Sequence, residues 1–236
     1  GGDNMMAAIG TGNVSPGVVT ASLGTSGTIY AHSREPVIDP AGELAAFCSS
    51  DGGWLPLVCT MNVTVATELT RELLALSTEE LNAKAAASTV GAEGVLLTPF
   101  FNGERTPALP NGTAGLSGLT SANFTQENVC RAAMEGATLG LRYGLDVLRR
   151  LGMHPAQIRL VGGGAKSSLW REIAANVFDC PVVRPAISEA GALGAALQAM
   201  WCVSHEQGIG VELKDVCDRY VQLDDSGAVS PGNEKA

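Results

Sequence analysis

The stretch IRLVGGGAKSSLW at residues 158–170 joins an apolar run, three consecutive glycines and a serine-led helix start. Residues 158–161 are typical of a buried strand, and residues 162–164 are typical of a tight turn. Ser167 or Ser168 is a suitable N-cap for the helix that follows. A strand that turns directly into a capped helix is characteristic of α/β domains. The stretch therefore predicts an α/β domain.

Further strands and helices alternate along the rest of the chain. Apolar alternation and turn residues predict strands at 18–23, 28–31, 54–58, 95–97, 158–161 and 181–183. Apolar residues at helical spacing predict helices at 63–76, 78–87, 127–150, 169–178 and 190–203. A small-residue helix is expected directly after Asp3. Residues 226–236 are polar, and we expect this tail to be frayed.

The composition limits the class of protein. A chain of 236 residues, 45% of them hydrophobic, suits one large domain or two small ones. The formal net charge of −9 disfavours nucleic acid or an anionic membrane as a partner, because both need clustered Lys and Arg. No apolar run approaches the roughly 18 residues that span a bilayer. No initiator Met precedes Gly1, so we expect the chain to be part of a longer protein.

The cysteines and histidines indicate no metal site. Six cysteines are scattered without a C-x-x-C pair, and three histidines lie apart from them. This pattern excludes the usual zinc spacings. We therefore expect no metal ligands, and we expect small buried thiols in a reducing, cytoplasmic compartment.

Two glycine-rich turns are candidate phosphate-binding loops. Gly24-Thr25-Ser26-Gly27 can aim backbone N–H groups and two hydroxyls at an anion, although glycine and serine are also ordinary turn residues. Gly162-Gly163-Gly164 follows a strand and precedes a helix, which is the setting in which backbone packs against a nucleotide. Neither the G-x-G-x-x-G fingerprint nor a P-loop is present. A purely structural turn remains the alternative for both.

Three charged residues are candidates for chemistry. Asp3 stands where a helix N-cap would stand, and it is therefore either a cap or a base that accepts a proton from a substrate hydroxyl. Glu104 and Arg105, in the loop NGERTP, are a base, a clamp or a solvated surface pair.

Six segments, taken together and in this order, resemble the C-terminal half of the FGGY family of carbohydrate kinases, most closely its xylulokinase branch. They are GGDN at 1–4, SLGTSG at 22–27, GERTP at 103–107, AGLSGLTSANFTQENVCRAAME at 114–135, GGGAKSSLW at 162–170 and ALGAA at 192–196. The resemblance implies two ribonuclease-H-like α/β domains of the actin and hexokinase type, each with a mixed sheet flanked by helices, with sugar and ATP between them. Residues 1–225 would be the C-terminal nucleotide-binding domain, 226–236 a polar tail, and the N-terminal sugar-binding domain would be absent.

The resemblance also implies roles for individual residues. Asp3 matches the general base that deprotonates the sugar hydroxyl. The nucleotide-binding positions would be Gly24, Thr25, Ser26 and Gly27 at the β- and γ-phosphates, and Gly163, Gly164, Ala165, Ser167 and Ser168 at the adenosine and α-phosphate. Asn4, Glu104 and Arg105 would shape the substrate cleft, and the helix at 191–195 would pack behind the second turn. Mg²⁺ would be held mainly through the nucleotide and the first domain.

The function that the resemblance implies is ATP-dependent phosphorylation of a sugar, with D-xylulose 5-phosphate as the expected product. Ribulose, gluconate and glycerol are alternative substrates. An actin-like module whose ATPase cycle drives conformation and a kinase-like regulator without catalysis are alternative classes. ATP, ADP and a sugar are the expected partners, with the N-terminal domain of the same chain, and a homodimer is left open.

Overall fold

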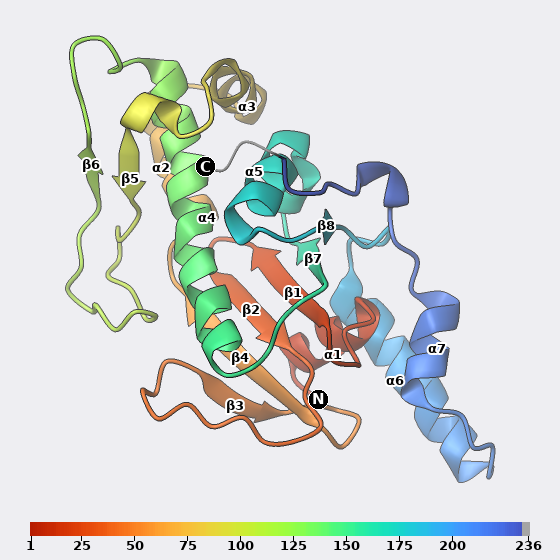
Figure 1. Ribbon diagram of the computed structural model, residues 1–236. Helices are drawn as coiled ribbons and strands as arrows, with labels where there is room; N and C mark the ends of the chain where they lie inside the picture. The colour runs from red at the N-terminus through yellow and green to blue at the C-terminus, as the bar shows by residue number, and fades with distance from the viewer. Residues whose placement is uncertain (233–236) are drawn as a thin grey trace.

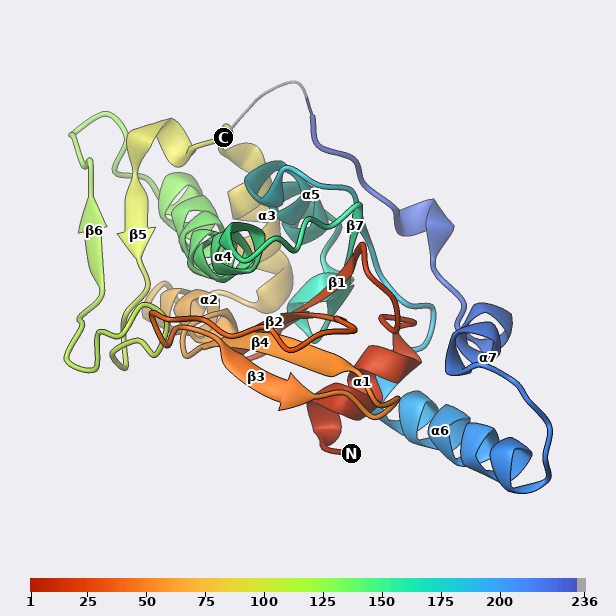
Figure 2. The same ribbon diagram turned by 60° about the horizontal axis from the view of Figure 1, so that its bottom comes forward.

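A mixed sheet lies at the centre of the molecule. The computed structural model describes residues 1–232 (Figures 1 and 2). Within them six strands pair in the order β3-β4-β2-β1-β7-β8. The strands β1 to β4 pair antiparallel, whereas β7 runs parallel to β1 and β8 runs parallel to β7. Their bounds are β1 Val18–Leu23, β2 Gly27–Ala31, β3 Ala45–Cys48, β4 Trp54–Thr60, β7 Gln157–Val161 and β8 Val182–Val183.

Helices cover both faces of this sheet, as the two views show. One face carries α2 Thr64–Leu73, α3 Thr78–Ala87, α4 Gln126–Arg150 and α5 Ser168–Phe178. The other carries α1 Asp3–Gly10, α6 Ala190–Glu206 and α7 Leu213–Tyr220. Within residues 1–232 there are also three short 3-10 turns: η1 Ala92–Gly94, η2 Gly164–Lys166 and η3 Asp225–Gly227. The α/β fold with a mixed sheet between helices is therefore confirmed.

The long helix α4 forms the centre of the larger core. Its apolar stripe includes Leu141, Leu145 and Leu148, which are fully buried against the sheet and α5. Thr125 caps its start, because the Asn128 backbone N–H donates to the Thr125 hydroxyl at 3.3 Å. Burial of the stripe gives this helix most of its stability, since each buried Leu contributes roughly 1.5–3 kcal/mol.

The helices α1 and α6 cross with their backbones in contact. A Cβ added to Gly194 would lie 1.7 Å from the Met6 carbonyl oxygen, and one added to Gly10 would lie 1.8 Å from the Ala190 oxygen. Only glycine allows this approach at either position. The expectation for the helix at 191–195 is therefore corrected, because it packs against α1 and not behind the glycine turn. Gly191 faces open space.

The strand predicted at 95–97 lies outside the central sheet. β5 Leu96–Thr98 pairs only with β6 Gly115–Ser117, on the outer side of α4. The prediction of a buried strand is wrong for Leu96, which is 44% exposed, although Leu97 is buried. The two-stranded sheet packs against α4 at Gly136, where an added Cβ would lie 2.1 Å from the Leu97 carbonyl oxygen.

The segment after α7 returns to the sheet. Val229 and Val182 exchange two backbone hydrogen bonds of 2.8 Å each, and the Gly232 N–H donates to the Asn176 side chain at 2.7 Å. The expectation of a frayed tail is therefore wrong for residues 226–232. The remaining tail residues, 233–236, lie outside the described residues. None of the helices described between residues 1 and 232 has the length and apolarity needed to cross a membrane.

Candidate active site

The two glycine turns lie at one edge of the sheet. β1 and β7 are parallel neighbours in a register that pairs Ser22 with Val161. The turn at 24–26 follows β1 directly and the turn at 162–164 follows β7 directly. Because the carboxyl ends of parallel strands meet at the same edge, the folding of the sheet brings both turns together.

Gly162 brings the backbones of the two turns into contact. Its φ of +91° lies in the region that favours glycine. A Cβ at this position would lie 2.7 Å from the Leu23 carbonyl oxygen and 3.1 Å from the Gly24 nitrogen. The second turn therefore needs glycine at its first position for conformation and for space.

The peptide units of the first turn have a fixed orientation. The Gly24 carbonyl accepts a hydrogen bond from the Thr64 N–H at 2.9 Å, and the Thr25 carbonyl accepts one from the Val63 N–H at 3.0 Å. Both peptide bonds are trans, so the N–H groups of Thr25 and Ser26 point away from the start of α2. No acceptor within residues 1–232 pairs with either N–H. The turn thus presents two free amides and two exposed hydroxyls, as anion-binding nests do.

The second turn leads into the capped helix α5. The Ser167 hydroxyl accepts the Trp170 N–H at 3.2 Å, so Ser167 is the N-cap and Ser168 is the first helical residue. Ser167 also donates to the Asn82 side-chain oxygen on α3 at 2.6 Å. Gly164 packs against the Trp170 ring, which an added Cβ would approach to 3.0 Å. These contacts join the glycine turn, α5 and α3 into one unit.

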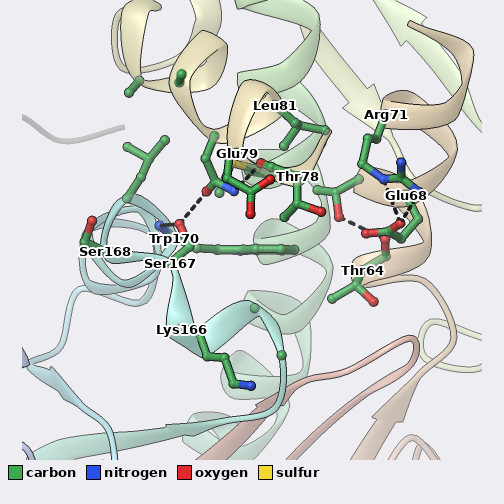
Figure 3. A pocket seen from close by; sticks show the side chains of 18 residues that line it. Thr64, Glu68, Arg71, Thr78, Glu79, Leu81, Lys166, Ser167, Ser168 and Trp170 are labelled. Atoms are coloured by element: carbon green, nitrogen blue, oxygen red, sulfur yellow. Dashed lines mark hydrogen bonds and ion pairs between the residues drawn. The ribbon is translucent and has the colours of Figure 1, made fainter. Parts of the chain in front are cut away.

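A cleft of about 850 Å³ opens between this unit and α2. Figure 3 shows side chains of α2 and of α5 on opposite sides of the cleft, with the Trp170 ring edge-on between them. Its lining includes Thr64, Glu68, Arg71, Thr78, Glu79, Asn82, Gly163, Gly164, Lys166, Ser167, Ser168 and Trp170. Thr64 lines the cleft, and its backbone N–H donates to the Gly24 carbonyl, which links this wall to the first turn. The volume and the mostly apolar walls suit a nucleoside.

The walls contributed by α2 and α3 are absent from the residues predicted from sequence. Thr64, Glu68, Arg71 and Asn82 belong to no motif, and their place at the cleft depends on tertiary packing against α4. Lys166 was also missed, although it lies inside the quoted stretch. No carboxylate within the described residues is in ion-pair distance of Lys166, which leaves its ammonium available to an anion.

Of the predicted nucleotide positions, Gly163, Gly164, Ser167 and Ser168 line this cleft. Ala165 lines a neighbouring hollow of about 390 Å³ on the other side of the glycine turn. None of Gly24, Thr25, Ser26 and Gly27 lines either space, although the hydrogen bond from Thr64 to Gly24 joins their turn to one wall of the cleft. Asp3, Asn4, Glu104 and Arg105 are not among the residues that line either space.

Asp3 lies at the exposed start of α1. Gly2 is the N-cap and Asp3 is the first helical residue, so the interpretation of Asp3 as the cap is wrong. Its Oδ1 accepts the Asn4 backbone N–H at 2.8 Å. Asn4 Oδ1 accepts the Thr28 hydroxyl at 3.5 Å, and Thr28 follows the first turn by one residue. Among the described residues the Asp3 carboxylate bonds only to Asn4, through Oδ1, and it lies on the helix that touches the β1–β2 hairpin.

Glu104 is buried, whereas Arg105 is exposed. The Glu104 side chain is 4% exposed, and its carboxylate accepts three hydrogen bonds: from Met61 N at 2.7 Å, Asn62 Nδ2 at 3.0 Å and Arg105 N at 2.8 Å. All three of these donors belong to the same chain, so the carboxylate is already hydrogen-bonded without a ligand. This geometry favours a shaping role for Glu104 over direct contact with a ligand.

Within residues 1–232, no group of three or more His, Cys, Asp or Glu side chains lies close enough to hold a metal ion. All six cysteines are free thiols, and three of them, Cys130, Cys180 and Cys217, are buried. Burial raises the pKa of Cys130 to about 11, so this thiol stays protonated near neutral pH.

Comparison with known proteins identifies the family of the chain. The model of the FGGY family of carbohydrate kinases, C-terminal domain, matches residues 19–203. The chain is 52% identical over 231 residues to the xylulose kinase of Haemophilus influenzae. This alignment covers 98% of this chain and 46% of that protein. It is 40% identical over 211 residues to the xylulose kinase of Streptomyces coelicolor, covering 89% and 42% respectively.

A solved structure shows the same fold. The crystal structure of xylulose kinase from Bifidobacterium adolescentis superposes with a TM-score of 0.85 at 41% identity, over 98% of this chain and 44% of that one. The chain thus spans a little under half the length of the relatives that it matches. The matched residues, the fold and the two glycine turns lead to one conclusion: the chain belongs to the FGGY family of carbohydrate kinases.

Proposed function

We propose that this chain supplies the nucleotide-binding half of an ATP-dependent sugar kinase. The observation that carries the proposal is the pairing of the turns at 24–27 and 162–164 at one sheet edge, beside a cleft of about 850 Å³. The free amides of the first turn suit the β- and γ-phosphates, and the cleft between α2, α3 and α5 suits the adenosine.

The chemistry assigned to Asp3 is that of a general base. Its carboxylate accepts the proton of a sugar hydroxyl, whose oxygen attacks the γ-phosphorus while the bond to ADP breaks. The amides of Thr25 and Ser26 and the ammonium of Lys166 offset phosphate charge. Mg²⁺ bound with the nucleotide would add to this charge compensation. The described residues offer no ligand cluster for it, so the ion would arrive with ATP or be held by residues beyond this chain.

The proposed substrate is D-xylulose and the product D-xylulose 5-phosphate. Three relatives named above are xylulose kinases, which favours this sugar over ribulose, gluconate or glycerol. An actin-like ATPase is disfavoured by the exposed Asp3 carboxylate, because such a protein has no substrate hydroxyl to deprotonate. A non-catalytic regulator is disfavoured because both glycine turns form and Asp3, the proposed base, is present.

The complete site needs a second domain. The relatives are about twice as long as this chain, and we propose that an N-terminal domain supplies most sugar contacts and closes over the cleft. Residues 1–236 alone would bind nucleotide weakly and transfer no phosphate. We place the reaction in the cytoplasm, where ATP is supplied and free thiols persist.

The experiment measures ADP release by the full-length protein with D-xylulose, D- and L-ribulose, gluconate, glycerol or no sugar. We expect turnover with D-xylulose, and a loss of roughly 10²–10⁴-fold in kcat for Asp3→Asn, which is the usual contribution of a general base.

The matched control is Asp215→Asn, which removes an exposed acid from the first turn of another helix, α7. Its kcat should stay within twofold of the wild type. ADP release that does not depend on sugar would overturn the kinase assignment, and full activity of Asp3→Asn would overturn the role of Asp3.

A further inference from the structure

The first glycine turn is held from behind by the junction between β4 and α2. The amides of Val63 and Thr64 bind the carbonyls of Thr25 and Gly24, and this pairing turns the opposite amides outward. Any movement of the junction would therefore rotate the peptide units that face the ligand. The orientation of the turn depends on what fixes residues 61–64.

Glu104 fixes that junction from a distant part of the sequence. One carboxylate oxygen accepts the Met61 N–H at 2.7 Å, and the other accepts Asn62 Nδ2 at 3.0 Å. Glu104 is 4% exposed and Asn62 is 1% exposed, so no water competes freely for these bonds. Hydrogen bonds to a buried carboxylate are stronger than those between neutral groups.

The loop that carries Glu104 is itself closed. Glu104 and Leu109 exchange two backbone hydrogen bonds, of 2.8 Å and 3.0 Å. Asn62 strengthens the attachment, because its Nδ2 donates to the Gly103 carbonyl at 2.7 Å and its Oδ1 accepts the Asn102 N–H at 3.3 Å. Glu104 is thus presented to the junction by a short, braced loop.

From these contacts we infer that Glu104 and Asn62 are positioning residues for the phosphate-binding turn, acting through the amides of Val63 and Thr64. The inference rests on the proposed function, in which residues 24–27 bind the β- and γ-phosphates. Neither side chain touches the substrates. Their effect is confined to the end of the nucleotide that the turn binds, and this sets them apart from residues that merely stabilise the fold.

The test compares Glu104→Gln with Glu135→Gln in the full-length protein. Glutamine at position 104 replaces one acceptor oxygen by an NH2 group, and an NH2 group that faces the Asn62 NH2 group cannot accept its hydrogen bond. Glu135 is a matched control, because it is 7% exposed and accepts a backbone N–H from Gly91 and a side-chain N–H from Arg131, away from the turn. Calorimetry measures the affinities for the ATP analogue AMP-PNP, for ADP and for AMP.

We expect Glu104→Gln to lower the affinity for AMP-PNP and for ADP roughly tenfold, which is the effect of losing about one charge-assisted hydrogen bond. The affinity for AMP should stay within twofold of the wild-type value. Glu135→Gln should leave all three within twofold. Equal losses for AMP and AMP-PNP, or wild-type affinity for both, would overturn the inference. As a second variant, Asn62→Asp should weaken AMP-PNP, and Glu104→Gln combined with Asn62→Asp should recover part of the loss through a reversed amide–carboxylate pair.

Hydrogen exchange of the free protein separates this inference from the proposed function. Glu104→Gln should speed the exchange of the Val63 and Thr64 amides at least tenfold, and Glu135→Gln should not. If the wild type binds no nucleotide, the proposed function fails, and the exchange result alone decides the positioning role. Unchanged exchange at residues 63 and 64 would overturn that role.

Discussion

His32 follows β2 directly and lies buried, with its Nε2 2.8 Å from the Oδ2 of Asp51. Burial alone would raise the pKa of the Asp51 carboxyl. The hydrogen bonds from the His32 ring, the Ser49 side chain and the Gly53 amide outweigh burial and lower this pKa to about 2. The carboxylate is therefore more stable in the folded chain than in the unfolded one.

This pair predicts a stability difference that depends on pH. The pKa of Asp51 lies below its unfolded value of 3.8, so its contribution is present above about pH 4 and is lost as the pH falls toward 2. We expect Asp51→Asn to lower the free energy of unfolding by about 1 kcal/mol at pH 7, given that the pair is only partly screened from water. The difference should shrink between pH 4 and pH 3 in denaturant titrations. A difference that is constant over this range would contradict the role of the carboxylate charge.

Single residues were predictable where a local rule determines their place. Ser167 was expected as one of two possible caps, and the Trp170 amide bonds to it because the helix start leaves that donor unpaired. Asp3 was placed one residue too early in its helix, since Gly2 takes the cap position without a side-chain bond. Glu104 binds Met61 and Asn62, which precede it in the sequence by 43 and 42 residues. No pattern within one segment reports such a contact.

At the scale of elements, the backbone contact between α1 and α6 predicts opposite effects of the same substitution at two glycines. Gly194→Ala places a methyl group against the Met6 carbonyl, which is backbone and cannot rotate away. We expect the loss in unfolding free energy to be about 1–3 kcal/mol, the usual range for overpacking. Gly191→Ala, in the same helix and with open space around it, should gain roughly 0.5–1 kcal/mol.

Thermal and denaturant unfolding of the two variants would measure this difference. If Gly194→Ala is as stable as Gly191→Ala, the contact between α1 and α6 is looser than described. Because Asp3 lies on α1, the same pair of variants also tests whether the base depends on this crossing. Gly194→Ala should then lower kcat, and Gly191→Ala should leave it within twofold.

The elements predicted with success are those whose pattern belongs to one segment. The capping box of α3, in which Ser77 and Glu80 each bind the other's backbone N–H, was readable as Ser-x-x-Glu. β3 was missed because all four of its residues are exposed and show no alternation. β6 was missed for the same reason. β5 was predicted as a strand at 95–97, but its pairing with β6 was not, because an apolar run of this length does not reveal which strand it pairs with.

At the scale of the whole molecule, the cleft joins two parts of the chain. Its walls come mainly from residues 64–86 and from residues 163–170, which are brought together by packing on α4 and by the hydrogen bond from Ser167 to Asn82. A nucleotide bound there contacts both parts and binds the folded state alone. Binding should therefore stabilise the domain as one unit.

We expect saturating AMP-PNP to raise the melting temperature of the full-length protein, since a ligand at 100 times its Kd adds about 2.7 kcal/mol. Hydrogen exchange should slow in both wall segments, 64–86 and 163–178. Slower exchange in the second segment alone would mean that α2 and α3 do not contact the nucleotide. Adenosine is the control, because it should protect the walls without protecting residues 24–27.

The return of the chain to β8 has a consequence for association between molecules. β8 is the last strand of the sheet, and such an edge offers unpaired backbone groups to any extended segment that meets it. Here Val229 binds the backbone donor and acceptor of Val182, and on either side of Leu223 the Ala186 N–H donates to the Gln222 carbonyl and the Asp224 N–H donates to the Arg184 carbonyl. The chain therefore covers this edge of its own sheet. A strand from another molecule would have to displace residues 223–229 before it could extend the sheet from this side.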